Sequence, residues 1–212
     1  MVQKLNYQKK LEEVILSFKT ERPSLLLHAC CAPCSSYVIE YLSSFFEITI
    51  LYYNPNIYPQ EEYFRRLAEL KKFLPNFPPA LQNKVKFVEQ NYNPQDFYDS
   101  IKIKQEPQLA FEAEKGERCR RCYEFRMKKA YNYACENNFD YFCTTLSISP
   151  FKDAEKINTL GNEICTQKTK WLTSDFKKKG GFKRSLELSK EYNLYRQQYC
   201  GCIYSKNNKN NV

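Results

Sequence analysis

Glycine and histidine are scarce in this 212-residue sequence, which has five glycines and one histidine. It has no Gly-rich loop of the kind that cradles nucleotide phosphates, so ATP chemistry is not expected. Long apolar runs are also missing, and no segment is expected to span a bilayer. Residues 1–20 are charged throughout and lack the uninterrupted apolar core of a secretion signal. These absences favour a cytoplasmic protein without a membrane partner.

Acidic residues are outnumbered, because 24 Asp and Glu stand against 33 Lys and Arg, giving a net charge of +9. Such an excess suits an anionic partner, and nucleic acid is favoured because no basic amphipathic membrane anchor is evident. The aromatic content of 16% adds many tyrosines, which can pack, form hydrogen bonds or stack on bases. Charge alone does not distinguish a nucleic-acid surface from an ordinary solvated basic surface.

Short apolar segments alternate with helical patterns through most of the chain. The expected strands cover residues 25–29, 47–53, 84–89, 140–146 and 170–176. One helix is expected to open at Pro59, and a long one to run from about Cys119 to Asn137. This alternation predicts an α/β fold, with a doubly wound, mostly parallel sheet that carries helices on both faces. Functional residues are then expected just beyond the carboxyl ends of the strands.

The chain is expected to form a single domain over residues 1–206. It has no internal repeat and no linker rich in Gly, Pro or Ser, and its length suits one hydrophobic core. Residues 91–116 are interpreted as an insertion over the sheet, and residues 207–212 as a frayed polar tail.

Ten cysteines in a chain of this kind indicate metal or redox chemistry in a reducing compartment rather than a disulfide framework. Seven of them fall into three groups with short spacings. The groups are CCAPC with Cys30, Cys31 and Cys34, CRRC with Cys119 and Cys122, and CGC with Cys200 and Cys202. The three isolated cysteines are expected to be small buried apolar side chains, and they are Cys135, Cys143 and Cys165.

The first two groups supply soft metal ligands. Cys119 and Cys122 share one face of a first helical turn, where the helix N-terminus and the arginines at 118, 120 and 121 are expected to favour thiolate. Together with Cys30 and Cys31 they fit either tetrahedral zinc or an iron–sulfur cluster, and spacing does not select the metal. His28 lies on an apolar strand and is expected to have a core or supporting role rather than to ligate metal.

The CGC group has a different geometry. Two thiols separated by one residue can close a small strained disulfide that is easily reduced, which suits a relay of electrons. In the alternative, Cys200, Cys202 or both ligate the same metal centre as the other cysteines.

Five segments, in one order over about 180 residues, resemble the QueH-type epoxyqueuosine reductase family. They are LLLHACCAPCSS, YYNPNIYPQEEYFRR, GERCRRCYEFRMKKA, TTLSISPFKDAEKIN and DFKKKGGFKRSLELSKEYNLYRQQYCGC. Tyr58 departs from the family pattern, which often has histidine at that position. The resemblance implies a fold like that of the adenine-nucleotide alpha-hydrolases (PP-loop-like), the fold of ATP-dependent tRNA-thiolating enzymes. A cysteine loop would replace their phosphate loop.

The resemblance also implies a reaction, in which the epoxide of epoxyqueuosine at the tRNA wobble position becomes the alkene of queuosine and water is released. That change takes two electrons, two protons and an external electron donor, and it does not use cobalamin. The implied [4Fe–4S] cluster is held by Cys30, Cys31, Cys119 and Cys122, and the implied redox-active pair is Cys200 with Cys202. Two further candidates are Cys34, for an additional metal ion, and Asp153, as an oxygen ligand, a proton donor or simply a helix cap.

Basic and aromatic residues could contact the tRNA. The run KKKGGFKR at 177–184 could meet phosphates, and the surface could be extended by Arg65, Arg66, Lys71 and Lys72. Residues that could stack on a base, or simply pack, are Tyr52, Tyr53 and Tyr58. Two alternatives remain at this point: a zinc-stapled RNA-binding module, and an iron–sulfur enzyme that transfers sulfur to tRNA.

Overall fold

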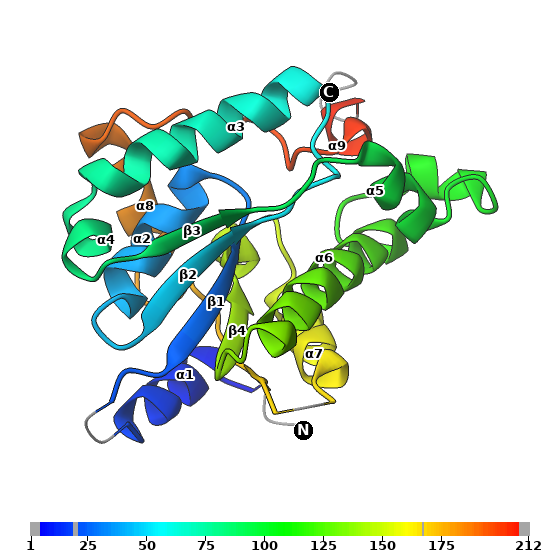
Figure 1. Cartoon of the computed structure of the whole chain (residues 1–212). Coiled ribbons are helices and arrows are strands. Elements are labelled where there is room, and N and C mark those ends of the chain that lie inside the picture. Colours follow the sequence, from blue (N-terminus) through cyan, green and yellow to red (C-terminus); the bar gives the residue numbers. More distant parts are fainter. Residues whose placement is uncertain (1–4, 19–20, 167, 208–212) are drawn as a thin grey trace.

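The computed structural model describes residues 5–18, 21–166 and 168–207. It confirms the α/β prediction, because a five-stranded sheet has the order β3-β2-β1-β4-β5 and every neighbouring pair is parallel (Figure 1). The strands are β1 (Ser24–Ala29), β2 (Glu47–Tyr52), β3 (Lys86–Glu89), β4 (Tyr141–Thr144) and β5 (Lys170–Trp171). The chain reverses its winding direction between β1 and β4, which is where open parallel sheets place their sites.

Helices cover both faces of the sheet (Figure 1). One face carries α2 (Ala32–Leu42), α3 (Gln60–Phe73), α4 (Pro78–Gln82) and α8 (Gly181–Glu191). The other carries α6 (Glu117–Glu136) and α7 (Ala154–Ile164). The remaining helices are α1 (Tyr7–Leu16), α5 (Pro94–Ile101), α9 (Ile203–Asn207) and the 3-10 turns η1 (Leu74–Asn76), η2 (Pro107–Phe111) and η3 (Thr145–Ile148).

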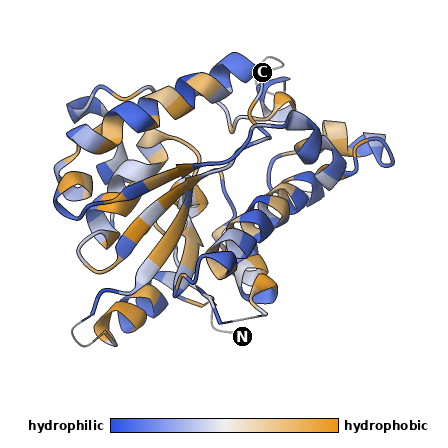
Figure 2. Ribbon diagram, viewed as in Figure 1, coloured by the Kyte–Doolittle hydropathy of each residue, from blue (hydrophilic) through white to orange (hydrophobic). Residues whose placement is uncertain are grey.

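The apolar strands explain this layering. Leu25, Leu26 and Leu27 of β1 are fully buried, so the central strand is covered on both faces. Figure 2 shows the same contrast, with hydrophobic strands in the middle and helices that alternate between hydrophobic and hydrophilic residues. The core therefore lies on both sides of β1.

Several details differ from the sequence-based expectations. The strand expected over residues 140–146 ends at Thr144, directly before η3. The last strand ends at Trp171 rather than at residue 176, because the backbone N–H of Ser174 bonds the Asn158 side chain instead of a neighbouring strand. Residues 91–116 form α5 and η2, which pack against α6. Asn207 ends α9, and residues 208–212 of the predicted tail lie outside the described part of the chain. Among the described helices none has the length and apolar character needed to cross a membrane.

Asn158 on α7 ties the helical layer to the end of the sheet. Its Nδ2 donates to the carbonyls of Ala154 (2.8 Å) and Ser174 (2.9 Å). Its Oδ1 accepts from Trp171 Nε1 and from Ser174 N, both at 3.0 Å. The side chain is fully buried, so one amide satisfies four buried polar groups at the point where β5 ends.

We predict that Asn158→Leu lowers the free energy of unfolding by about 2–4 kcal/mol, because a similar volume is kept while buried donors and acceptors lose their partner. Chemical denaturation measures the change. The control is Asn162→Ala one turn later, where the side chain is exposed and gives one hydrogen bond to the Asn158 carbonyl, so about 0.5 kcal/mol is expected. Equal losses in the two variants would contradict this role of Asn158.

Candidate metal and redox site

The first cysteine group lies at the switch point of the sheet. Cys30 follows β1 directly, and its Sγ lies 3.9 Å from Oγ1 of Thr145, the residue that follows β4. Cys31 is the N-cap of α2 and is fully buried. The ligand atoms of Cys30, Cys31 and Cys34 lie within 4.8 Å of one another, which is close enough to bind one metal centre.

These three thiols influence one another. Hydrogen bonds from the thiols of Cys31 and Cys34 hold the pKa of Cys30 well below its usual range. Burial, followed by the hydrogen bond to Cys30, raises the pKa of Cys31 to about 12. One thiolate shared by two thiols is therefore the favoured state of the group before it binds a metal.

The other two groups meet in a second place. Cys119 and Cys122 lie in the first turns of α6, and Cys202 lies just before α9. These three and Cys200 line one small cavity. The structure thus brings together CRRC and CGC, which lie about 80 residues apart in the sequence, and the spacing of the cysteines does not reveal this contact.

The arginines beside Cys119 and Cys122 do not make them thiolates, which corrects the expectation from sequence. Arg120 and Arg121 both pair with Glu117, at 2.7 and 2.9 Å. Burial raises the pKa of Cys119, and it raises that of Cys122 to about 12. At neutral pH these cysteines are thiols, and binding of a metal ion would be what deprotonates them.

Arg126 of α6 lies within electrostatic reach of all three cysteine groups. It is buried and donates from Nε to the Cys122 carbonyl and from Nη1 to Oδ1 of Asn54, each at 3.3 Å. Burial opposes its charge, yet Cys122, Cys200 and Cys30 raise its pKa on balance. One guanidinium therefore interacts electrostatically both with the cysteines after β1 and with those around the small cavity.

Buried positive charge exceeds buried negative charge around the cysteines. The buried cations are Arg66, Arg118, Arg126 and Lys152. Among the described residues only Arg66 has a carboxylate within ion-pair distance, that of Glu62 at 2.7 Å. The Nη2 atoms of the three arginines have no hydrogen-bond partner there either. Orphaned buried cations call for an anion, and a metal cluster held by thiolates carries the matching charge. The residues present therefore fit such a group.

The C-terminal segment, residues 194–202, is held against α3. Tyr195 receives the Arg65 guanidinium over its ring at 3.4 Å, and its hydroxyl donates to the Glu62 carboxylate. Arg66 Nη1 donates to the Cys200 carbonyl at 3.3 Å, so this arginine is a buried clamp. The prediction that Arg66 belongs to an exposed tRNA surface is wrong, because its side chain is fully buried.

Gly201 is required between the two cysteines of CGC. Its φ of +127° lies in the region that favours glycine, and a Cβ there would come within 3.1 Å of Ile57 and 3.2 Å of Arg66. Its carbonyl accepts a hydrogen bond from the backbone N–H of Tyr58 at 2.8 Å. The backbone of the loop after β2 therefore fixes CGC, and Tyr58 itself keeps an exposed ring.

A larger cavity of about 140 Å³ opens beside the first cysteine group. Its lining includes Cys30, Cys34, Lys152, Phe182, Gln197 and Cys200. Gln197 Nε2 donates to Cys31 Sγ at 3.0 Å, which joins the wall of the cavity to the cysteines. Cys200 lines both this cavity and the small one around Cys119, so it connects them.

Asp153 lies away from the large cavity. Its Oδ1 accepts a hydrogen bond from Lys156 N at 3.1 Å and caps α7, and its side chain lines an open groove next to the groove-facing Lys177. The neighbouring Lys152 turns inward instead: Nζ donates to Cys200 Sγ at 2.6 Å. Sequence reasoning chose Asp153 from the motif SPFKD and missed Lys152 one position earlier.

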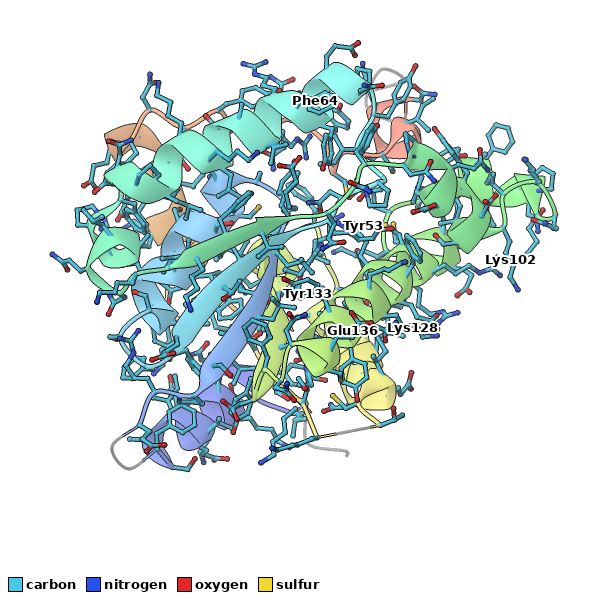
Figure 3. The ribbon with its side chains drawn as sticks, in the orientation of Figure 1. Tyr53, Phe64, Lys102, Lys128, Tyr133 and Glu136 are labelled. Atoms are coloured by element: carbon cyan, nitrogen blue, oxygen red, sulfur yellow. The ribbon has the colours of Figure 1, made fainter. Side chains whose placement is uncertain are left out.

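The remaining candidates lie in the core. His28 is fully buried, its ring nitrogens lie 2.8 Å from Thr144 Oγ1 and 3.0 Å from the Tyr53 carbonyl, and burial lowers its pKa to about 4. It is a supporting residue, as predicted. Tyr52 and Tyr53 are buried as well, so neither stacks on a base. Figure 3 shows Tyr53 beside α6. The Tyr53 ring lies 5.9 Å from the ring of Phe125 on that helix.

The isolated cysteines are mostly as expected. Cys143 is fully buried, and burial raises its pKa to about 12. Cys135 and Cys165 are half-buried and pack against the main core.

Comparisons with known proteins point in one direction. The family model for epoxyqueuosine reductase QueH matches residues 25–208. The epoxyqueuosine reductase QueH of Streptococcus pyogenes serotype M1 is 42% identical over 208 residues, with 96% of this chain and 79% of the relative covered. That of Staphylococcus epidermidis is 40% identical, with 96% and 85% covered. That of Haemophilus influenzae is 38% identical, with 88% and 73% covered.

We predict opposite effects of Arg126→Met on the metal-free and the metal-loaded protein. Removal of a buried, unpaired charge should raise the free energy of unfolding of the metal-free form by about 1–3 kcal/mol, while iron is retained less well. Denaturation curves and iron analysis measure the two effects. Lys129→Met, on an exposed position of the same helix, should change neither. A destabilised metal-free variant with full iron content would show that the protein itself neutralises Arg126.

Proposed function

Because the chain belongs to the epoxyqueuosine reductase QueH family, a family of oxidoreductases, we propose that it reduces the epoxide of epoxyqueuosine in tRNA to the alkene of queuosine. The observation that carries the proposal is the position of Cys200, which lines both the large cavity beside Cys30 and the small cavity around Cys119. A redox-capable thiol thus faces a cavity for a small ring on one side and candidate metal ligands on the other.

The cofactor of this proposal is a [4Fe–4S] cluster held by Cys30, Cys31, Cys119 and Cys122. When bound, such a cluster supplies electrons singly at a potential set by its surroundings. Support comes from the buried arginines that lack carboxylate partners, since the positive wall matches an anionic group. Cys34 belongs to the same thiol group as Cys30 and Cys31 and is proposed to hold an additional metal ion. Cobalamin has no part in the proposed reaction.

Cys200 and Cys202 are the proposed redox-active pair. Reduction of the epoxide breaks both C–O bonds and needs two electrons and two protons. Oxidation of two thiols to a disulfide supplies both, so that epoxide plus dithiol gives alkene, water and disulfide. An external donor then restores the dithiol. The burial of Cys202 limits competing reactions of the pair with solvent.

The large cavity is proposed to take the cyclopentane ring of the modified base. Its wall combines polar side chains, among them Ser149, Gln197 and Tyr199, with the aromatic Phe182. Hydroxyl groups of the ring can bond the polar side chains while its carbon face packs on the aromatic one. Phe151, which also lines the cavity, is 63% exposed and is placed to contact a neighbouring base.

The proposed path of the tRNA backbone is a groove of about 900 Å³ that meets the large cavity at Pro150 and Lys152. Lys177, Lys178 and Lys179 line this groove. Lys177 pairs with Asp175 at 2.7 Å and Lys179 pairs with Glu12, so the groove carries both signs of charge before it meets a phosphate.

The fold is proposed to be of the adenine-nucleotide alpha-hydrolase type, with the cysteine loop after β1 where those enzymes have a phosphate loop. The strand order and the position of Cys30 support this relationship. No ATP is consumed in the proposed reaction, because a helix start that presents buried cysteines leaves no glycine-rich cradle for phosphates.

The proposed function is tested with anaerobically purified or reconstituted protein. We predict brown protein with broad thiolate-to-iron absorption, lost in air, that converts epoxyqueuosine in tRNA to a nucleoside lighter by one oxygen atom. Mass spectrometry of the digested tRNA measures the product. Stoichiometric zinc, no uptake of iron and unchanged tRNA would instead identify a zinc-stapled RNA-binding module.

Cysteine variants separate the two roles within the same experiment. Cys200→Ser and Cys202→Ser should keep iron and visible absorption and lose turnover, while Cys30→Ser and Cys119→Ser should lose both together. A weakly reducing buffer is used, because strong dithionite could feed the cluster directly and hide the relay. If Cys200→Ser loses as much iron as Cys119→Ser, CGC is part of the metal site.

Salt dependence tests the groove. We predict that replacing Lys177, Lys178 and Lys179 with Ala makes tRNA affinity less dependent on salt. The slope of log affinity against log salt concentration should decrease in magnitude by about one for each lysine that contacts a phosphate. The control is Lys128→Ala on α6, across the sheet, where the lysine pairs with Glu124 at 2.6 Å. An unchanged slope in the triple variant would make residues 177–179 an ordinary solvated surface.

A further inference from the structure

The loop of residues 112–116, between η2 and α6, brings a carboxylate to the wall of the large cavity. Glu114 in this loop is half-buried and lines that cavity together with Cys30 and Cys200. The next residue, Lys115, lines the groove instead. The loop therefore lies between the proposed site of the cyclopentane ring and the proposed path of the tRNA backbone.

Contacts on both sides of Glu114 hold this loop in place. The two carboxylate oxygens of Glu112 accept hydrogen bonds from two backbone N–H groups in the first turn of α6, each at 2.7 Å. On the other side, Lys156 of α7 donates from Nζ to the Lys115 carbonyl. The backbone at Glu114 is thus tied to two helices, so its carboxylate has a defined position on the cavity wall.

The Glu114 carboxylate has no basic partner in the described part of the chain, because no Lys or Arg there lies at ion-pair distance from it. It is also the one carboxylate among the described residues that line the large cavity, to which Lys152 and Arg196 add positive charge. A ligand with a positively charged group is repelled by these two side chains and attracted by Glu114. Glu114 is therefore the carboxylate through which the cavity can pair with a cationic ligand.

The substrate of the proposed reaction carries a positive charge close to its reacting bond. In epoxyqueuosine a secondary aliphatic amine joins the cyclopentane ring to the base, and such an amine, like a lysine side chain, is protonated at neutral pH. The ring carbon that bears this nitrogen is bonded directly to the epoxide. An ion pair that fixes the nitrogen therefore also fixes the adjacent epoxide.

We propose that Glu114 is a binding residue that recognises the substrate by pairing with this secondary ammonium group. The proposal rests on the proposed function and deepens it. The amine lies between the ring and the base, as residues 112–116 lie between the cavity and the groove, so the two arrangements match. With its nitrogen beside Glu114, the ring holds its epoxide inside the cavity that Cys30 and Cys200 also line.

The test compares two tRNAs that differ in one charge. Both have the same sequence and carry 7-deazaguanine at the wobble position, one with a cationic aminomethyl group and the other with a neutral cyano group of similar size. Neither contains an epoxide, so binding is measured without turnover. Affinity for each tRNA is measured at one salt concentration with metal-loaded wild-type protein, Glu114→Gln and Glu136→Gln. Glu136 is exposed at the other end of α6 (Figure 3), so this control makes the same change of charge away from the cavity.

Wild-type protein and Glu136→Gln should bind the cationic tRNA about 10-fold or more tightly than the neutral one, which is the usual strength of a hydrogen bond to a charged group. Glu114→Gln should lose this preference, because its amide has nearly the same shape but no charge. In turnover of epoxyqueuosine-tRNA the same variant should raise KM about 10-fold and keep kcat within about threefold of wild type, since the reaction leaves the ammonium group unchanged. All three proteins should retain iron.

Three results would overturn the proposal. Wild-type protein without the preference, or Glu114→Gln with it, would show that the carboxylate does not recognise the charge. A fall in kcat with unchanged KM and unchanged preference would place Glu114 in the chemical step instead. If wild-type protein leaves epoxyqueuosine unchanged, the proposed function itself has failed, whereas the two tRNAs without an epoxide still decide whether Glu114 recognises the ammonium group.

Discussion

Buried positive charge is the constraint on which the rest of this site depends. Arg126 interacts electrostatically with a cysteine of each of the three groups and has no carboxylate partner among the described residues. Arg118 and Lys152 also lack a carboxylate partner there. A protein of this size can bury such cations only where an anion compensates them. Thiolates are the available anions. Burial raises the pKa of Cys31 and that of Cys122 to about 12, so these two thiols lose their protons only when a metal ion binds them. Cations and cysteines therefore need a third component, and a metal centre satisfies both.

Much of the fold and the identity of the cysteine groups could be predicted from sequence. The apolar runs that became β1 and β2 contain the pattern of a doubly covered strand, and Cys30 follows β1 as the rule for parallel sheets requires. Local spacing also separated Cys143, which is buried, from the clustered cysteines. These features depend on neighbours in the chain, so a pattern can report them.

What sequence could not provide is long-range contact. The approach of Cys200 to Cys119 depends on how residues 194–202 cross α3, and no local pattern encodes that path. The prediction for Arg66 failed for the same reason. An arginine in a charged helix is normally exposed, but Arg66 is buried and donates to the carbonyl of Cys200, far along the chain. The place of Lys152 in the site likewise depends on a long-range contact, the hydrogen bond from its Nζ to Cys200 Sγ.

The packing of residues 194–202 against α3 also sets an order of events during synthesis. A ribosome makes Cys30, Cys31, Cys119 and Cys122 well before it reaches Cys200. Domains generally fold from their N-terminal parts as the chain emerges. The sheet can therefore assemble while Arg66 and Arg126 still lack the last of the cysteines around them. At that stage the C-terminal segment has not yet been made, so the candidate ligands stay accessible until this segment packs over them.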